Sequence, residues 1–285
     1  MGERKLTDVF VLNNGRTIPC IGYGTYKTTG EEVYDAVLSA VKAGYRHIDT
    51  AAYYHNEEGV GRAVRECGVP REELFITSKV WNTDRGYENT KKAFAATMER
   101  LGLAYLDLYL IHWPANRKQF GENAEKINAE TWKALEELYA EGKVRAIGLS
   151  NFLPHHMEEL MKTAKVKPMV DQIEFHPGWA QLEVSGYCQK NDIVVEAWSP
   201  LGRRGALESG ILQEIGAKYG KSAAQVCVRW VLQHGILPLP KTVTPERMTE
   251  NADVFDFALT AEEMKVIDEL KDLGGQCALP DEVDF

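Results

Sequence analysis

Residues 29–49 read TGEEVYDAVLSAVKAGYRHID, and this stretch predicts one helix followed by one strand. Its apolar residues recur at the i, i+3, i+4, i+7 and i+8 spacing of one helical face, as Val33, Ala36, Val37, Ala40 and Val41. Gly44 is a helix stop, and the segment after it ends in Asp49. A helix and a strand in this order form one unit of an alternating α/β fold.

The same alternation continues along the chain. A later helix is predicted to begin at Ser222, which forms a capping box with Gln225 ahead of another apolar face. Eight short apolar segments are predicted to be strands, at residues 19–23, 45–49, 74–79, 106–112, 144–149, 169–173, 193–197 and 236–239. We expect a single (β/α)8 TIM barrel of the α/β class, forming one domain over residues 1–285. Periodicity alone also allows a doubly wound parallel sheet.

An N-terminal β-hairpin is predicted ahead of the barrel. Residues 10–12 and 17–18 favour strands, and Asn14-Gly15 between them is a turn signal.

Composition restricts the partners and the compartment. The 285 residues hold 33 basic and 42 acidic side chains, and the resulting net charge of −9 disfavours a nucleic-acid partner. The five cysteines form no CxxC pair, which is typical of reduced thiols and predicts a cytoplasmic protein. No signal-peptide core and no apolar run long enough to span a membrane is found in the sequence, so no membrane partner is expected.

Several local patterns do not complete a motif. Gly22-Tyr-Gly24 begins like a dinucleotide-binding fingerprint, but Lys27 stands where the third glycine is required. His155 and His156 are neighbours on a predicted helix, where ring vectors diverge, so we expect a solvated face and no metal site. His176 is expected to be a hydrogen-bonded structural histidine.

Ionisable residues end three consecutive predicted strands, where a barrel keeps its chemistry. They are Asp49, Lys79 and His112, and Tyr54 follows the first of them by five residues. A free phenol has a pKa of about 10, which a nearby ammonium lowers by stabilising the phenolate. A carboxylate would hold that ammonium in place, and a neutral imidazole could orient a carbonyl. Together the four residues predict a site that protonates a carbonyl oxygen while another group attacks the carbon.

Longer motifs that contain these residues resemble the aldo-keto reductase superfamily, its small bacterial members in particular. They are GYRHIDTAAYYHNE at 44–57, LIHWP at 110–114, GLSNF at 148–152, QIEFHP at 172–177 and LPKTVTPERMTEN at 239–251. The resemblance implies NADPH-dependent reduction of aldehydes or ketones to alcohols. Tyr54 would be the general acid, Lys79 would lower its pKa, Asp49 would pair with Lys79, and His112 would orient the substrate carbonyl.

The resemblance also implies a set of cofactor-binding residues. Gly24 and Thr25 would contact the cofactor, and Trp198 would stack on its nicotinamide ring. The carboxamide would be bound by Ser150, Asn151 and Gln172, and the pyrophosphate by Ser199, Leu201 and Gly202. The 2′-phosphate would be bound by Lys241, Thr242 and Arg247, and the adenine by Glu250 and Asn251. The residues themselves support an anion site. Thr244 is a fair helix N-cap, Pro245 suits the first helical position, and Arg247 follows in the first turn. Without the resemblance, Arg247 and Glu250 would be interpreted as a surface ion pair.

Four aromatic residues are expected to wall the substrate pocket, namely Tyr23, Tyr26, Trp81 and Trp113. The segments after Gly202 and after Gly275 are short, which predicts an open and permissive site. Asp171 stands where the family commonly has Asn, and a small electrostatic effect on Gln172 is expected.

We therefore expect a monomeric reductase of small carbonyl compounds. The alternative is a non-catalytic, nicotinamide-binding barrel that acts as a binding or structural subunit. A barrel glycosidase is a further alternative, but it requires a second strand-end carboxylate beside Asp49 and leaves Lys79 and Arg247 unexplained.

Overall fold

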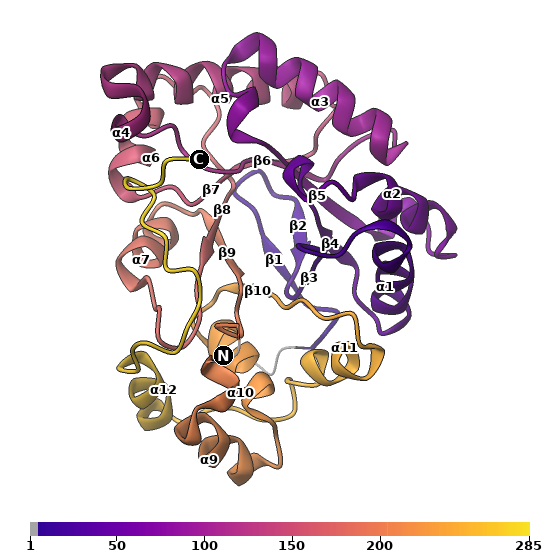
Figure 1. Cartoon of the computed structure of the whole chain (residues 1–285), viewed down its shortest axis with the longest axis vertical. Helices are drawn as coiled ribbons and strands as arrows, with labels where there is room; N and C mark the ends of the chain where they lie inside the picture. Colours follow the sequence, from indigo (N-terminus) through magenta and orange to yellow (C-terminus); the bar gives the residue numbers. More distant parts are fainter. Residues whose placement is uncertain (1–4, 204) are drawn as a thin grey trace.

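Eight parallel strands form a barrel in the computed structural model, which describes residues 5–203 and 205–285 (Figure 1). The strands are β3 Tyr23–Gly24, β4 His47–Asp49, β5 Phe75–Val80, β6 Leu108–Ile111, β7 Ile147–Ser150, β8 Val170–Glu174, β9 Val194–Trp198 and β10 Leu237–Leu239. Each strand pairs in parallel with the next one along the chain. This unbroken order confirms the predicted (β/α)8 barrel and excludes the doubly wound sheet. The single domain over residues 1–285 stays a prediction.

Two backbone hydrogen bonds bring the first and last barrel strands together. The Gly22 amide donates to the Pro238 carbonyl at 3.0 Å, and the Gly24 amide donates to the Pro240 carbonyl at 3.1 Å. Of the first predicted strand, residues 19–23, only Tyr23 lies in β3, and Pro19 pairs within the hairpin instead.

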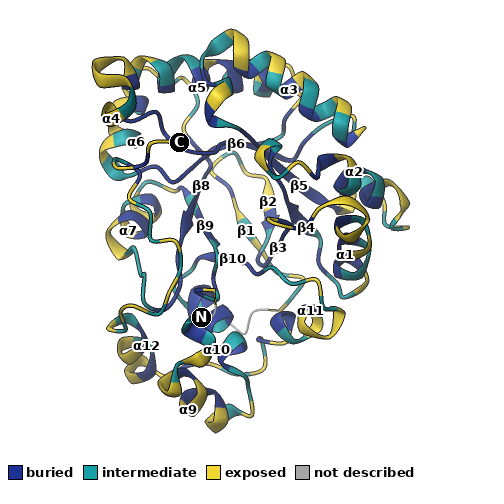
Figure 2. Cartoon of the chain, in the orientation of Figure 1, coloured by how far each residue is buried: buried dark blue, intermediate teal, exposed yellow. Residues whose placement is uncertain are grey.

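The helices surround the barrel and turn their apolar faces towards it (Figure 2). They are α1 Gly30–Lys42, α2 Glu57–Glu66, α3 Tyr87–Leu101, α4 Arg117–Phe120, α5 Ala124–Ala140, α6 Pro154–Met161, α7 Leu182–Lys190, α8 Gly205–Glu208, α9 Gly210–Tyr219, α10 Ala223–Gln233, α11 Pro245–Ala252 and α12 Ala261–Asp268. All five residues of the predicted apolar face of α1 are buried. The capping box of Ser222 and Gln225 is present at the start of α10. Within the described residues, no helix has the length and apolarity needed to cross a lipid bilayer.

The predicted hairpin is confirmed and lies at the N-terminal ends of the barrel strands. Its strands are β1 Val9–Val11 and β2 Thr17–Pro19. In the turn, Asn13 Nδ2 donates to the Pro168 carbonyl at 2.8 Å, just ahead of β8. The opposite end of the barrel, where the strands end, is left for the functional site.

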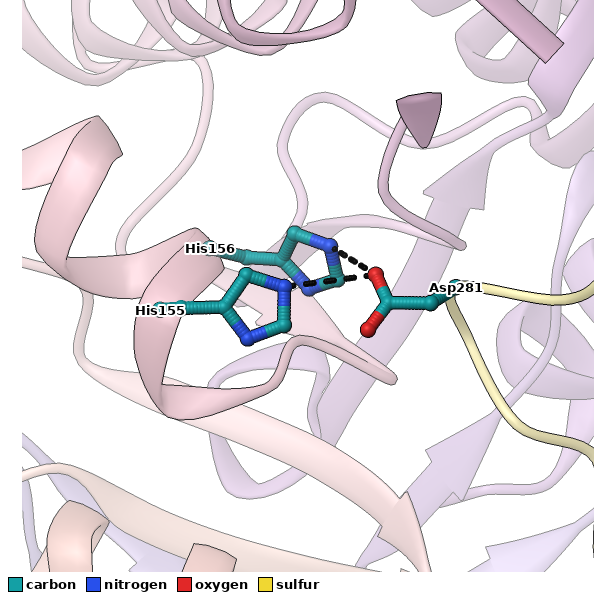
Figure 3. Close-up of side chains that lie close together, drawn as sticks. All are labelled: His155, His156 and Asp281. Carbon is teal, nitrogen blue, oxygen red and sulfur yellow. Dashed lines mark hydrogen bonds and ion pairs between the residues drawn. The ribbon is translucent and has the colours of Figure 1, made fainter. Parts of the chain in front are cut away.

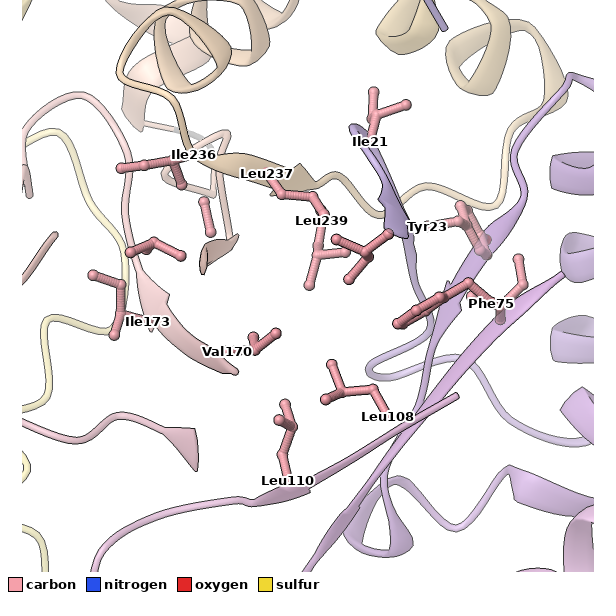
Figure 4. Packing of buried hydrophobic residues seen from close by; sticks show 14 of the residues in the cluster. Ile21, Tyr23, Phe75, Leu108, Leu110, Val170, Ile173, Ile236, Leu237 and Leu239 are labelled. Atoms are coloured by element: carbon pink, nitrogen blue, oxygen red, sulfur yellow. The ribbon is translucent and has the colours of Figure 1, made fainter. Parts of the chain in front are cut away.

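Strand parity decides which side chains face the barrel interior. Leu108, Leu110, Val170 and Leu239 project inward and pack against one another (Figure 4). The residue that follows Val170 must therefore point outward, towards the surrounding helices.

That outward residue is Asp171, for which a small electrostatic effect on Gln172 was expected. It is fully buried, accepts a hydrogen bond from the Phe152 amide at 3.4 Å and lies 3.9 Å from Cys188 Sγ. Burial raises the pKa of Asp171 to about 8. The acid is therefore neutral at pH 7, and its effect is on stability and not on the charge around Gln172.

Replacing Asp171 by Asn should stabilise the protein increasingly as the pH rises. Above the unfolded-state pKa of about 3.9, only the folded state keeps the Asp171 proton, so stability is lost as the pH rises towards the folded-state pKa of about 8. The amide that Asp171→Asn introduces cannot titrate, and its oxygen can still accept from Phe152. The melting temperature of Asp171→Asn, relative to the parent, should be higher at pH 8 than at pH 5. An equal difference at both values would show that Asp171 is not protonated in the fold.

Candidate active site

The four predicted catalytic residues lie together at the C-terminal ends of β4, β5 and β6. Asp49 ends β4, Lys79 lies on β5, and His112 follows β6. Tyr54 ends a short 3-10 turn, η1 Ala52–Tyr54, in the loop after β4. Lys79 Nζ donates to Asp49 Oδ1 at 2.6 Å and to Tyr54 Oη at 3.4 Å. The Tyr54 and His112 rings meet edge to face, with centroids 5.7 Å apart.

The charges in this group are confined to one ion pair. Burial alone would lower the pKa of Lys79, but Asp49 and Tyr54 outweigh it and raise that pKa, so the ammonium stays charged. Burial, with the charges of Lys79 and Arg85, holds the pKa of His112 well below its usual range, and the imidazole is neutral.

Burial is also the largest influence on the pKa of the Tyr54 phenol. It raises the pKa of Tyr54 to about 12, although Lys79 acts in the lowering direction as predicted. Tyr54 is therefore protonated at neutral pH, and a developing phenolate would find an ammonium 3.4 Å away. The arrangement suits a group that donates a proton.

A cavity of about 1090 Å³ opens over these residues. Most of the predicted site residues line it, namely Gly24, Tyr26, Asp49, Tyr54, Trp81, His112, Trp113, Ser150, Asn151, Gln172, Trp198, Ser199, Leu201, Lys241, Thr242, Arg247, Glu250 and Asn251. Lys79 lies beneath the surface of the cavity, behind Asp49 and Tyr54. One continuous cavity thus joins the catalytic group to the predicted anion site.

Polar side chains at the ends of β7 and β9 form a hydrogen-bonded group on the cavity wall. Asn151 Nδ2 donates to the His112 carbonyl at 2.9 Å and to Ser150 Oγ at 3.1 Å. Trp198 Nε1 donates to Asn151 Oδ1 at 2.9 Å, while the Trp198 ring borders the cavity. These contacts hold the indole in place as a flat apolar surface, which fits the ring of a nicotinamide.

Two cations mark the far end of the cavity. Neither Lys241 nor Arg247 forms an ion pair with any residue that the structure describes, and Glu250 instead accepts from Ser222 Oγ. The surface ion pair between Arg247 and Glu250 is therefore absent from the described part of the chain. Arg247 lies in the first turn of α11, after Thr244 and Pro245 as predicted. Two such cations beside a helix N-terminus fit a bound phosphate.

Three residues with predicted ligand contacts do not line the cavity, and their contacts stay predictions. Tyr23 is an outward-facing neighbour of Gly24 on β3, and its hydroxyl donates to the Thr242 carbonyl at 2.6 Å. Thr25 is buried, and its hydroxyl donates to the Asp49 carbonyl at 2.9 Å. Gly202 packs close to His176 and Ala206 with a left-handed φ of +55°. All three pack against residues that surround the cavity.

Sequence reasoning missed two aromatic residues of the pocket. The Tyr53 ring stacks on Trp81 with centroids 3.8 Å apart. Phe285 lies parallel to Trp81 at 6.1 Å and meets Trp113 edge to face at 5.3 Å. Tyr53 directly precedes Tyr54 in the motif and could have been included on that ground, whereas no local pattern indicates Phe285.

Hydrogen bonds place Phe285 by fixing the tail that follows α12. Asn116 Nδ2 donates to the carbonyls of Pro280 at 2.8 Å and Val283 at 2.9 Å.

A second anchor of the tail is the contact of two neighbouring histidines with Asp281. The rings of His155 and His156 do not diverge as expected, because both reach Asp281 Oδ1, at 3.2 and 2.9 Å (Figure 3).

The tautomer of His156 explains this contact. His156 Nδ1 accepts from the Leu153 amide at 3.1 Å, so its Nε2 carries the hydrogen and donates to Asp281. The anchored tail adds Phe285 to the pocket wall, so the site is more enclosed on this side than expected.

His176 contacts the same tail. It is fully buried, and its Nδ1 lies 2.8 Å from the Pro177 carbonyl, which agrees with a structural histidine. The Glu174 carboxylate beside it accepts from the amides of Gln276 and Cys277, each at 2.6 Å.

The comparisons with known proteins agree with this geometry. Residues 20–272 match the Aldo/keto reductase family. The glyoxal reductase of Bacillus subtilis is 53% identical over 266 residues, which cover 93% of each chain. The 9,11-endoperoxide prostaglandin H2 reductase of Trypanosoma cruzi is 51% identical over 271 residues, again 93% of each chain. Among solved structures, a mutant of Gox0644 in complex with NADPH superposes with a TM-score of 0.89 at 39% identity, covering 98% of this chain and 99% of that one.

Proposed function

The chain belongs to the aldo/keto reductase family and is an oxidoreductase, and from this premise we propose that it reduces aldehydes and ketones to alcohols with NADPH. The observation that carries the proposal is the position of Lys79 Nζ, 2.6 Å from Asp49 and 3.4 Å from Tyr54, on a cavity that ends at Lys241 and Arg247.

The residues along the cavity fit NADPH, which supplies the hydride when bound. Trp198 offers the flat surface for the nicotinamide ring, and Ser150, Asn151 and Gln172 lie beside it for the carboxamide. Lys241, Thr242 and Arg247 would bind the 2′-phosphate at the other end. The NADPH complex of a structure that superposes at a TM-score of 0.89 supports this cofactor.

Tyr54 supplies the proton to the substrate oxygen in this proposal. Its hydroxyl is protonated at neutral pH, and Lys79 stabilises the phenolate that remains after proton transfer. The neutral imidazole of His112, across the Tyr54 ring, orients the carbonyl without adding charge.

Small carbonyl compounds fit the wall formed by Tyr26, Tyr53, Trp81, Trp113 and Phe285, which presents mainly apolar ring surface. We propose reactive aldehydes, glyoxal among them, as the first substrates to test, since a relative with 53% identity is a glyoxal reductase. The proposal includes a monomeric, cytoplasmic protein without nucleic-acid or membrane partners, in line with the net charge of −9.

Removal of the Tyr54 hydroxyl should abolish most turnover. Loss of a general acid costs about 10²- to 10⁴-fold, so Tyr54→Phe should reduce kcat by at least about 100-fold. NADPH oxidation with glyoxal, followed by absorbance, measures this loss, and tryptophan fluorescence should show NADPH binding close to that of the parent. Tyr53→Phe removes a phenol from the same wall without a contact to Lys79 and should cost much less. NADPH binding without turnover by the parent protein would instead favour a non-catalytic binding subunit.

Arg247 should distinguish NADPH from NADH. A charge-assisted hydrogen bond contributes about 1.5–3 kcal/mol, so Arg247→Ala should raise the Kd for NADPH about 10- to 100-fold. The Kd for NADH should change little, because NADH has no 2′-phosphate. Lys126→Ala, on the exposed surface of α5, changes the net charge equally and is the matched control. Equal weakening of both cofactors would contradict the assignment of Arg247.

A further inference from the structure

A second carboxyl group lies beneath the catalytic group, on the inner face of the barrel. Glu196 is fully buried on β9 and pairs in register with Gln172 on β8. Gln172 Nε2 donates to Glu196 Oε2 at 2.8 Å and to Asp49 Oδ2, also at 2.8 Å. One amide group therefore bridges the catalytic carboxylate and a carboxyl group to which no role has been given.

This bridge uses both N–H groups of the Gln172 amide. Its oxygen Oε1 is left, and it can only accept. The reverse orientation would place Oε1 against Asp49, whose negative charge Lys79 fixes at 2.6 Å. Since that contact would be repulsive, the amide has one favourable orientation. Gln172 borders the cavity and therefore offers a ligand an acceptor and no donor.

The surroundings of Glu196 favour its neutral form. Asp49 on β4 is the anion nearby, and the charge of Lys79 on β5 is already paired with it. His47 on β4 lies 3.7 Å from Glu196 Oε1, but burial lowers the pKa of His47 to about 3, so this imidazole is neutral. Burial and Asp49 together raise the pKa of Glu196 to about 8. Gln172 and Lys79 act in the lowering direction, but Glu196 Oε1 has no hydrogen-bond partner among the described residues, and burial and Asp49 prevail.

We propose that Glu196 is a positioning residue for the cofactor, which holds Gln172 as an acceptor for the nicotinamide carboxamide and, on losing its proton, favours the oxidised cofactor over the reduced one. This inference rests on the proposed function. The nicotinamide ring of NADP⁺ carries a positive charge and that of NADPH is neutral, so an anion behind Gln172 stabilises only the former. The proton that Glu196 loses goes to solvent.

The test is the ratio of the two cofactor affinities as a function of pH. Tryptophan fluorescence gives the Kd of NADP⁺ and of NADPH between pH 6.5 and 9.5. In the parent protein, the ratio of the Kd for NADP⁺ to that for NADPH should fall by at least about threefold across pH 8. The 2′-phosphate is common to both cofactors and cancels in the ratio. Tyr54, with its pKa near 12, does not titrate in this range.

Two variants separate positioning from a general effect of buried acids. Glu196→Gln keeps an acceptor for Gln172 but cannot ionise, so its ratio should not change with pH. Asp171→Asn removes another buried carboxyl group whose pKa is also raised to about 8, on the outer face of β8, and should keep the slope of the parent. A slope that persists in Glu196→Gln, or its absence in the parent, would overturn the inference.

A second measurement needs no variant. Calorimetry in two buffers of different ionisation enthalpy counts the protons released on binding. Near pH 7.5, NADP⁺ should release a larger fraction of a proton than NADPH, and equal counts would contradict the role of Glu196. If neither cofactor binds the parent protein, the proposed function fails together with this inference. Binding of both with a ratio that does not change with pH rejects the inference alone.

Discussion

The ion pair between Lys79 and Asp49 is the interaction on which the site depends. Both groups are almost completely buried, and removal of such ions from water costs several kcal/mol each. Further hydrogen bonds offset this cost, because Lys79 also donates to the Thr50 carbonyl at 3.0 Å and Asp49 accepts from Gln172. Removal of either ion would leave the other buried without its partner. The positions of Tyr54 and Gln172 follow from this pair, because each contacts one of its members.

Four titratable groups around the pair are neutral, and burial is the main cause in each case. It lowers the pKa of His47 and of His112, and it raises the pKa of Tyr54 and of Glu196. The reacting groups therefore surround one compensated pair of charges, while Arg85 is charged nearby and Lys241 and Arg247 lie at the far end of the cavity. In this buried environment a new charge interacts strongly with its neighbours, because little water screens it. Ammonium, phenol and imidazole are thus placed where a change of charge on the ligand has a large effect.

Sequence patterns predicted the parts of this molecule that repeat or that end a strand. The helical face from Val33 to Val41 and the strand-end residues Asp49, Lys79 and His112 all follow from periodicity and fold class. Tyr23 was misplaced because the parity of a two-residue strand cannot be read locally, and Gly24 takes the inward position. Phe285 could not be predicted, because its place depends on contacts of the tail with Asn116, His155 and His156. Glu196 lies within a predicted strand, but only the register with Gln172 reveals its partner.

The contact between β3 and β10 has a consequence for folding. Seven of the strand pairings join neighbours along the chain, whereas closure of the barrel brings together Gly22 and Pro238 from its two ends. Among the strand contacts of the described residues, this closure joins the longest loop and so has the largest entropic cost of loop closure, and two backbone hydrogen bonds hold it. The cavity crosses this contact, with Gly24 on one side and Lys241 on the other. A molecule bound there contacts both the first and the last barrel strand segments, so by mass action its binding opposes separation of these two strands.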